Sequence, residues 1–125
     1  MDFTGFGEVA ERLRRSTVVV RGESGGGGSG VVCSADGLIV TNAHVLGGRR
    51  SSIQLWDGRE LEADIRQMDR SRDLAALRVS SQGLPAAVLA DSTCVRAGEL
   101  ALAIGNPMGF VGALREQVLP AIAKA

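Results

Sequence analysis

The first 16 residues carry apolar side chains at helical spacing. These positions recur at intervals of three and four, with Glu and Arg between them: Phe3, Phe6, Val9, Ala10 and Leu13. Such a period gathers the apolar side chains on one face of a helix. It predicts a short amphipathic helix within residues 1–16 that ends near Arg15 and packs as a lid on the rest of the fold.

From Thr17 onward the pattern changes to short apolar or β-branched runs separated by turn residues. Two of the turns contain Asp-Gly pairs, in which glycine supplies the positive φ of a tight hairpin. No helical pattern separates successive runs, which argues against a parallel sheet. The pattern predicts an all-β fold, an antiparallel barrel or sandwich, with strands over 17–20, 30–33, 38–41, 52–55, 61–65, 74–79, 87–89 and 100–104.

Composition narrows the possible functions. Lys and Arg together number 14, as do Asp and Glu, and only four residues are aromatic. The chain therefore lacks the basic surface and the stacking side chains of a nucleic-acid-binding protein. No apolar run approaches the ~18 residues that cross a bilayer, so no membrane span is expected. The N-terminus lacks the features of an export signal, and the sequence as printed predicts a cytoplasmic location.

Two residues suggest acid–base chemistry. His44, the single histidine, follows a strand-like run, and Asp73 opens another. A neutral imidazole can take a proton from a hydroxyl and return it to a leaving amine, provided that a carboxylate orients the ring. The rival acids are Asp64 and Asp69, and Asp69 lies in a polar turn where solvent or an arginine is its expected partner. A structural His44 and a strand-capping Asp73 are the alternatives.

Three motifs carry a family resemblance. The segments T-N-A-H-V, D-x-x-x-D-L-A-x-L and A-I-G-N-P-M-G occur in this order at 41–45, 69–77 and 103–109. Together they resemble the trypsin-like serine proteases of the HtrA/Do (DegP-like) family. The resemblance covers roughly Thr17 to Gly112, and the match fades beyond.

The resemblance implies a fold and an activity. It implies the first β-barrel of a trypsin-like double-barrel fold over residues 17–112, after a helical segment at 1–16 and before a divergent tail at 113–125. It also implies peptide-bond hydrolysis of protein or peptide substrates without metal or cofactor, with His44 as general base and Asp73 as orienting acid. Members of this family often work in the periplasm or are secreted.

The nucleophile is missing from this pattern. After Asp73 the serines are Ser80, Ser81 and Ser92, and none is followed by two glycines. We therefore expect a chain that is truncated or split before its serine and is inactive alone, with the nucleophile on a missing or separate polypeptide. Ser24 lies in a G-x-S-G-G context, but it precedes His44, whereas the family nucleophile follows the acid.

The glycine-rich stretch containing Ser24 has two further interpretations. Gly25-x-Gly27-x-x-Gly30 fits a dinucleotide-binding fingerprint, but that fingerprint must open a helix, and here it leads into a strand-like run. A mobile surface loop between two strands is the preferred interpretation.

Other functions remain as alternatives. The chain could be a non-catalytic peptide-binding or protein-binding module derived from a protease barrel. A lone barrel leaves an apolar face open, so self-association or a missing second barrel is expected, with 100–104 and 118–122 as candidate linings. A metal site is disfavoured because one histidine and two distant cysteines lack ligand spacing. Cys33 and Cys94 could pair, although free thiols are favoured.

Overall fold

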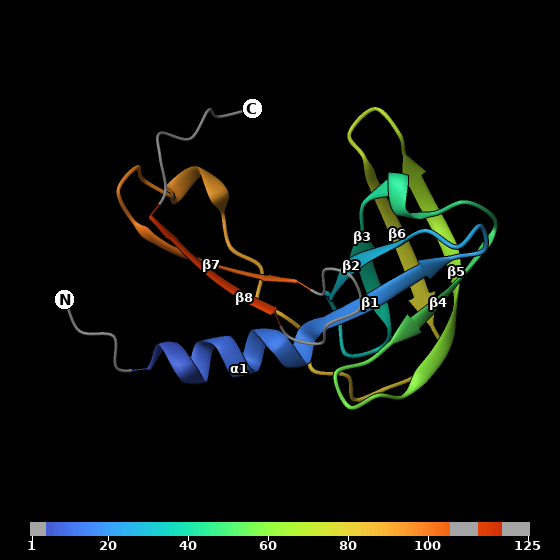
Figure 1. Ribbon diagram of the computed structural model, residues 1–125, viewed down its shortest axis with the longest axis horizontal. Helices are drawn as coiled ribbons and strands as arrows, with labels where there is room; N and C mark the ends of the chain where they lie inside the picture. Colours follow the sequence, from blue (N-terminus) through green and yellow to red (C-terminus); the bar gives the residue numbers. More distant parts are fainter. Residues whose placement is uncertain (1–4, 106–112, 119–125) are drawn as a thin grey trace.

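The computed structural model describes residues 5–105 and the backbone of residues 113–118 (Figure 1). Helix α1 (Phe6–Ser16) leads into eight strands, with short 3-10 turns η1 (Ala43–Val45) and η2 (Ser92–Cys94) between some of them. The strands are β1 (Thr17–Gly22), β2 (Gly27–Val32), β3 (Leu38–Thr41), β4 (Arg50–Gln54), β5 (Glu60–Asp69), β6 (Leu74–Val79), β7 (Leu100–Gly105) and β8 (Ala113–Val118).

Six of these strands form a closed antiparallel barrel. Its order is β1-β2-β3-β6-β5-β4, and β1 closes the ring by pairing with β4 as well as with β2. The prediction of an all-β antiparallel barrel with a short N-terminal helix is confirmed. None of the helices described is long and apolar enough to cross a membrane.

Alternation along the strands fills the barrel interior. In β6 every second residue is buried, and β3 and β4 show the same period of two. The side chains that are almost completely buried come from five of the six strands: Val18, Val20, Val32, Ile39, Ile53, Leu77 and Val79. Truncating one of the buried Ile or Leu side chains in this set to Ala typically costs about 2–5 kcal/mol. This core holds together the strands from whose ends the site is built.

The glycine-rich stretch forms a tight hairpin on this core. Gly27–Val32 is strand β2, so the structure contradicts both a dinucleotide-binding helix and a loop running through Gly30. A Cβ on Gly30 would stand 2.9–3.1 Å from methyl groups of Val18, Val20 and Ile39. Glycine at this position lets the backbone approach the core closely.

Helix α1 joins the barrel without a loop. The Thr17 hydroxyl donates to the carbonyl of Leu13 (2.7 Å), and the guanidiniums of Arg14 and Arg15 stand 5.6 and 4.9 Å from the ring centre of Trp56. Helix α1 also contacts strands β1 and β7. Figure 1 shows the helix extending away from the barrel, so the predicted lid is wrong.

The region after the barrel differs most from the prediction. The expected strand at 87–89 is irregular, and Val88 and Leu89 are 94% and 73% exposed. Strand β7 was expected, but it pairs with β8 in a separate two-stranded sheet. The β8 sequence, Ala-Leu-Arg-Glu-Gln-Val, has no β-branched or alternating pattern before its last residue, and the strand is defined by its pairing with β7.

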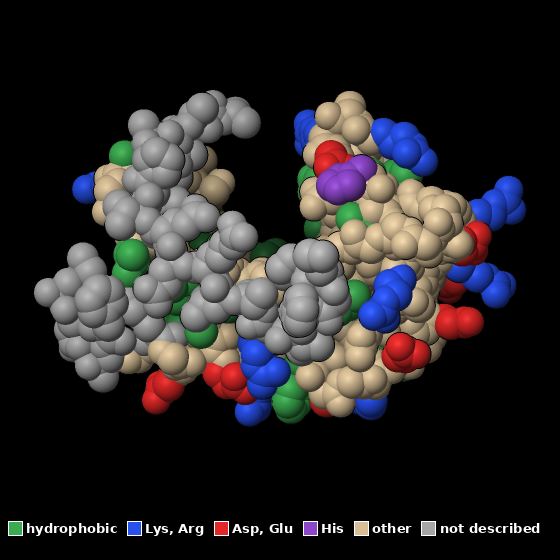
Figure 2. All heavy atoms as spheres, viewed as in Figure 1, with side chains coloured by type: hydrophobic (Ala, Val, Ile, Leu, Met, Phe, Trp, Pro, Cys, Tyr) green, Lys and Arg blue, Asp and Glu red, His purple; other side chains and the backbone are tan. Residues whose placement is uncertain are grey.

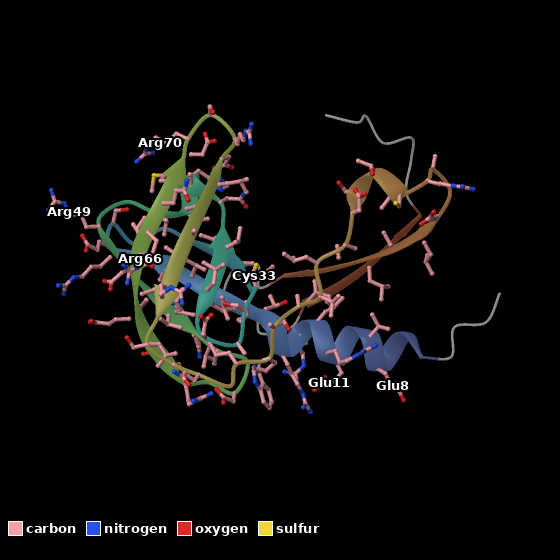
Figure 3. The ribbon with its side chains drawn as sticks, turned by 180° about the vertical axis from the view of Figure 1, so that it is seen from behind. Glu8, Glu11, Cys33, Arg49, Arg66 and Arg70 are labelled. Carbon is pink, nitrogen blue, oxygen red and sulfur yellow. The ribbon has the colours of Figure 1, made fainter. Side chains whose placement is uncertain are left out.

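The two cysteines do not form a disulfide. Both are free. Cys33 is half-buried directly after β2 (Figure 3), and Cys94 is exposed in η2. Burial raises the pKa of the Cys33 thiol, which disfavours its reactive thiolate.

Candidate active site

The end of β3 and the turn η1 position His44. The Thr41 hydroxyl donates to the carbonyl of Ser29 (2.7 Å), which fixes the last residue of β3. Within η1, Ala43 and Val45 are buried, so the side chain between them is directed outward. The His44 side chain is 72% exposed.

The β5–β6 hairpin positions Asp73. The Asp69 carboxylate accepts hydrogen bonds from the Ser71 hydroxyl (2.6 Å) and the Arg72 N–H (3.2 Å), which shape the turn. Figure 3 shows Arg70 near the end of this hairpin. Asp73 ends the turn at φ 55°, and among the described residues it alone has a positive φ without being glycine.

Strand pairing brings the two segments together. β3 and β6 are antiparallel neighbours, and Thr41 stands opposite Ala75. His44 lies three residues beyond Thr41, and Asp73 lies two residues before Ala75. The barrel register therefore places both residues at the same end of the same strand pair.

The two side chains are in direct contact. His44 Nδ1 lies 2.7 Å from Asp73 Oδ2, and the backbone N–H of His44 donates to Asp73 Oδ1 at 2.8 Å. Within the described residues Nε2 has no hydrogen-bond partner. The imidazole is uncovered on the surface of the barrel (Figure 2). This arrangement orients the ring through one nitrogen and leaves the other free to exchange a proton.

A family comparison covers the segments that carry this pair. The family model described as "Trypsin-like peptidase domain" matches residues 28–124. The chain belongs to this family. The match includes β3, η1 and the β5–β6 hairpin, and therefore both residues of the pair.

Curated relatives of this peptidase domain include named serine proteases. The "Probable periplasmic serine endoprotease DegP-like" of Halomonas elongata is 40% identical over 96 residues, which cover 76% of this chain and 20% of the relative. "Serine protease HTRA2, mitochondrial" of Drosophila pseudoobscura pseudoobscura is 38% identical over 101 residues, covering 78% and 24%. "Serine protease HTR4" of Rattus norvegicus is 38% identical over 100 residues, covering 78% and 20%. The chain spans less than a quarter of the length of these relatives.

The other candidate residues of this peptidase domain lie elsewhere. Asp69 is engaged in its own turn, with Arg72 Nε 3.7 Å away, in line with the arginine partner expected for it. Asp64 is exposed on β5. Ser24 lies in the β1–β2 turn against Gly47, where an added Cβ would overlap its hydroxyl oxygen. The described residues contain no group of three or more His, Cys, Asp or Glu able to hold a metal ion.

One residue of the site did not emerge from the sequence as a contact. Asn42 Nδ2 donates to the backbone carbonyl of Asp73 (2.9 Å). The motif drew attention to Asn42 only as a neighbour of His44. Its partner lies 31 residues away, so the contact becomes visible only when the β3–β6 register is known.

Hydrogen bonding lowers the pKa of the Asp73 carboxyl below its usual value. The backbone N–H of His44 contributes most, followed by the imidazole, and both favour the charged carboxylate. Because the folded-state pKa is depressed, the stabilisation is present above the ordinary Asp value of about 3.9 and is lost as pH falls through the folded value.

This shift predicts an acid-dependent difference between the wild type and Asp73→Asn. The wild type should have the larger free energy of unfolding at pH 6, and the difference should shrink as pH falls below about 4, where the unfolded-state carboxyl begins to protonate. Urea unfolding at a series of pH values measures it. A difference that stays constant down to the lowest pH at which the chain folds would contradict the assigned hydrogen bonding.

Proposed function

We propose that this chain supplies the general base and the orienting acid of a serine endopeptidase. The observation that carries the proposal is the 2.7 Å contact between His44 Nδ1 and Asp73 Oδ2, made by a His44 side chain that is 72% exposed. Family membership and the names of the relatives support the same reaction class. Protein or peptide substrates follow from that class.

In this mechanism His44 moves protons between nucleophile and leaving group. Nε2 takes the proton of a serine hydroxyl as its oxygen bonds to the peptide carbonyl carbon, and the carbonyl π electrons move onto oxygen. The imidazolium then gives the proton to the amine nitrogen as the C–N bond breaks, and water hydrolyses the acyl-serine by the same path. Asp73 stays ionised throughout. The serine and the oxyanion donors come from residues outside the printed 125.

The printed chain alone should not hydrolyse casein or a peptide ester above background. No serine after Asp73 has the glycine-rich context that also supplies oxyanion N–H groups. Hydrolysis assays on the wild type and on Ser24→Ala check this expectation. Activity that a serine-directed phosphonate and Ser24→Ala both abolish would instead assign the nucleophile to the glycine-rich hairpin. Activity that survives Ser24→Ala would indicate another nucleophile.

A non-catalytic binding module is the second candidate. Large apolar side chains on the surface favour it, since Val31, Leu74, Val88 and Leu89 are all exposed. The same residues favour self-association or a partner barrel. Of the segments predicted to line an open face, 100–104 is mostly half-buried in β7, and 119–122 lies outside the described residues.

Light scattering over a concentration series tests the exposed apolar surface. We expect the weight-average mass to rise with concentration, because association would remove the exposed Val88 and Leu89 side chains from water. A monodisperse monomer at high concentration that binds no hydrophobic dye would contradict this expectation and would show that the chain closes its own core.

A further inference from the structure

Asn42 occupies a capping position without acting as a cap. It is the N-cap residue of η1, from which an Asn side chain usually accepts a hydrogen bond from an N–H of the first turn. It makes no such bond. Its Nδ2 donates instead to the backbone carbonyl of Asp73, 2.9 Å away on the β5–β6 hairpin.

The Asp73 carboxylate performs the capping that Asn42 does not. Asp73 Oδ1 accepts the backbone N–H of His44, the second residue of η1, at 2.8 Å. Asn42 and His44 therefore both donate to one aspartate. The side chains of Asn42 and Asp73 thus each bond to the backbone of the other segment, Asn42 to the Asp73 carbonyl and Asp73 to the His44 N–H.

These two hydrogen bonds meet at Asp73, whose backbone has a positive φ. A non-glycine residue at φ 55° has a conformational cost, and such a conformation persists when its surroundings hold it in place. On one side the Asp73 N–H makes only a long bond to Arg70, at 3.3 Å. On the other side the Asp73 carbonyl is held by Asn42.

We propose that Asn42 is a positioning residue. Its amide holds the Asp73 backbone in the left-handed conformation that directs the carboxylate at the His44 N–H and ring. The position of the Asp73 carboxylate is thus determined by the Asn42 amide and the His44 backbone, and not only by the imidazole that it orients. The relevance to catalysis rests on the proposed function, whereas the positioning itself is a property of this chain alone.

The pKa of the Asp73 carboxyl, measured by NMR titration of the full chain, reports this positioning. Asn42→Ala removes the donor. Asn42→Ser also loses the reach to Asp73 but can cap η1 with its own hydroxyl, so η1 is retained. In both variants we expect the Asp73 pKa to rise toward its ordinary value, because the His44 N–H and ring then meet the carboxylate less well. The His44 amide should also exchange about fivefold faster, the effect of one typical hydrogen bond.

Ser71→Ala is the matched control. It removes another side-chain hydrogen bond of the same hairpin, the one to Asp69, without touching Asp73. It should leave the Asp73 pKa unchanged even where thermal melting shows an equal loss of stability. A purely structural Asn42 would behave in the same way as Ser71.

Two results would overturn the proposal. One is an Asp73 pKa that stays at the wild-type value in both Asn42 variants. The other is an Asp73 pKa that Asn42→Ser alone keeps at the wild-type value, since capping of η1 would then hold the acid. No measurement here involves peptide hydrolysis, so the proposal can fail while the proposed function stands, and the reverse also holds.

Discussion

A Gly37→Ala variant is expected to lose about 3 kcal/mol or more of unfolding free energy. Gly37 has φ 110°, a conformation that L-residues rarely adopt, and a Cβ there would overlap the backbone carbonyl oxygen of Val79. The Gly37 carbonyl also accepts the Val79 N–H at 3.0 Å. Relieving the overlap must displace the end of β6 and weaken this bond, so strain and a lost hydrogen bond act together. Urea unfolding measures the change.

Gly58→Ala is the control for this expectation. Gly58 has a similar φ of 89° in the other Asp-Gly turn, but no atom lies within 4 Å of an added Cβ. Only the conformational cost remains, about 1–2 kcal/mol. Equal losses in the two variants would show that φ alone matters and that the Val79 overlap relaxes at no cost.

The second large effect concerns catalysis. In a chain extended by the segment that supplies the serine, Asp73→Asn should lower kcat about 10⁴-fold. An Asn amide can present its N–H to His44 Nδ1, which favours the ring tautomer with its proton on Nε2. That nitrogen can then no longer accept the serine proton. Peptide-ester hydrolysis with the folded state checked by circular dichroism measures the loss.

Asp69→Asn is the matched comparison for Asp73→Asn. It neutralises the other acid of the same hairpin, four residues away, whose carboxylate bonds to Ser71 and Arg72 rather than to His44. Its kcat should stay within a few-fold of the wild type. If Asp69→Asn matched the loss of Asp73→Asn, hairpin geometry rather than the orienting carboxylate would explain both.

The parts of the fold that sequence predicts are those where burial alternates along the chain. β3 and β6 are identifiable because Ile39 and Leu77 alternate with less buried neighbours, and these strands carry the two residues of the pair. The strand predicted at 87–89 is absent because Val88 and Leu89 are exposed rather than buried. β8 was missed because strand pairing, not apolar content, defines it. Hydrophobicity predicts a strand through burial, and the segment 87–89 does not follow that relation.

Some contacts of the site could likewise be predicted from the sequence and others could not. The contact between His44 and Asp73 was expected from residue chemistry and from the family resemblance. The left-handed conformation of Asp73 and its bond from Asn42 were not, because both depend on how two strands align across the barrel. Residue types identify which groups can react. Strand register decides which groups hold them in place.

Barrel closure also sets the order in which the site is made. All six barrel strands lie between Thr17 and Val79, and β6, which follows Asp73, is the last of them. Synthesis proceeds from the N-terminus, and domains generally fold as units in that direction. The base and its acid can therefore meet once β6 has left the ribosome, before segments that lie further along the chain have folded. During biosynthesis, a nucleophile encoded downstream would reach a proton acceptor that is already oriented.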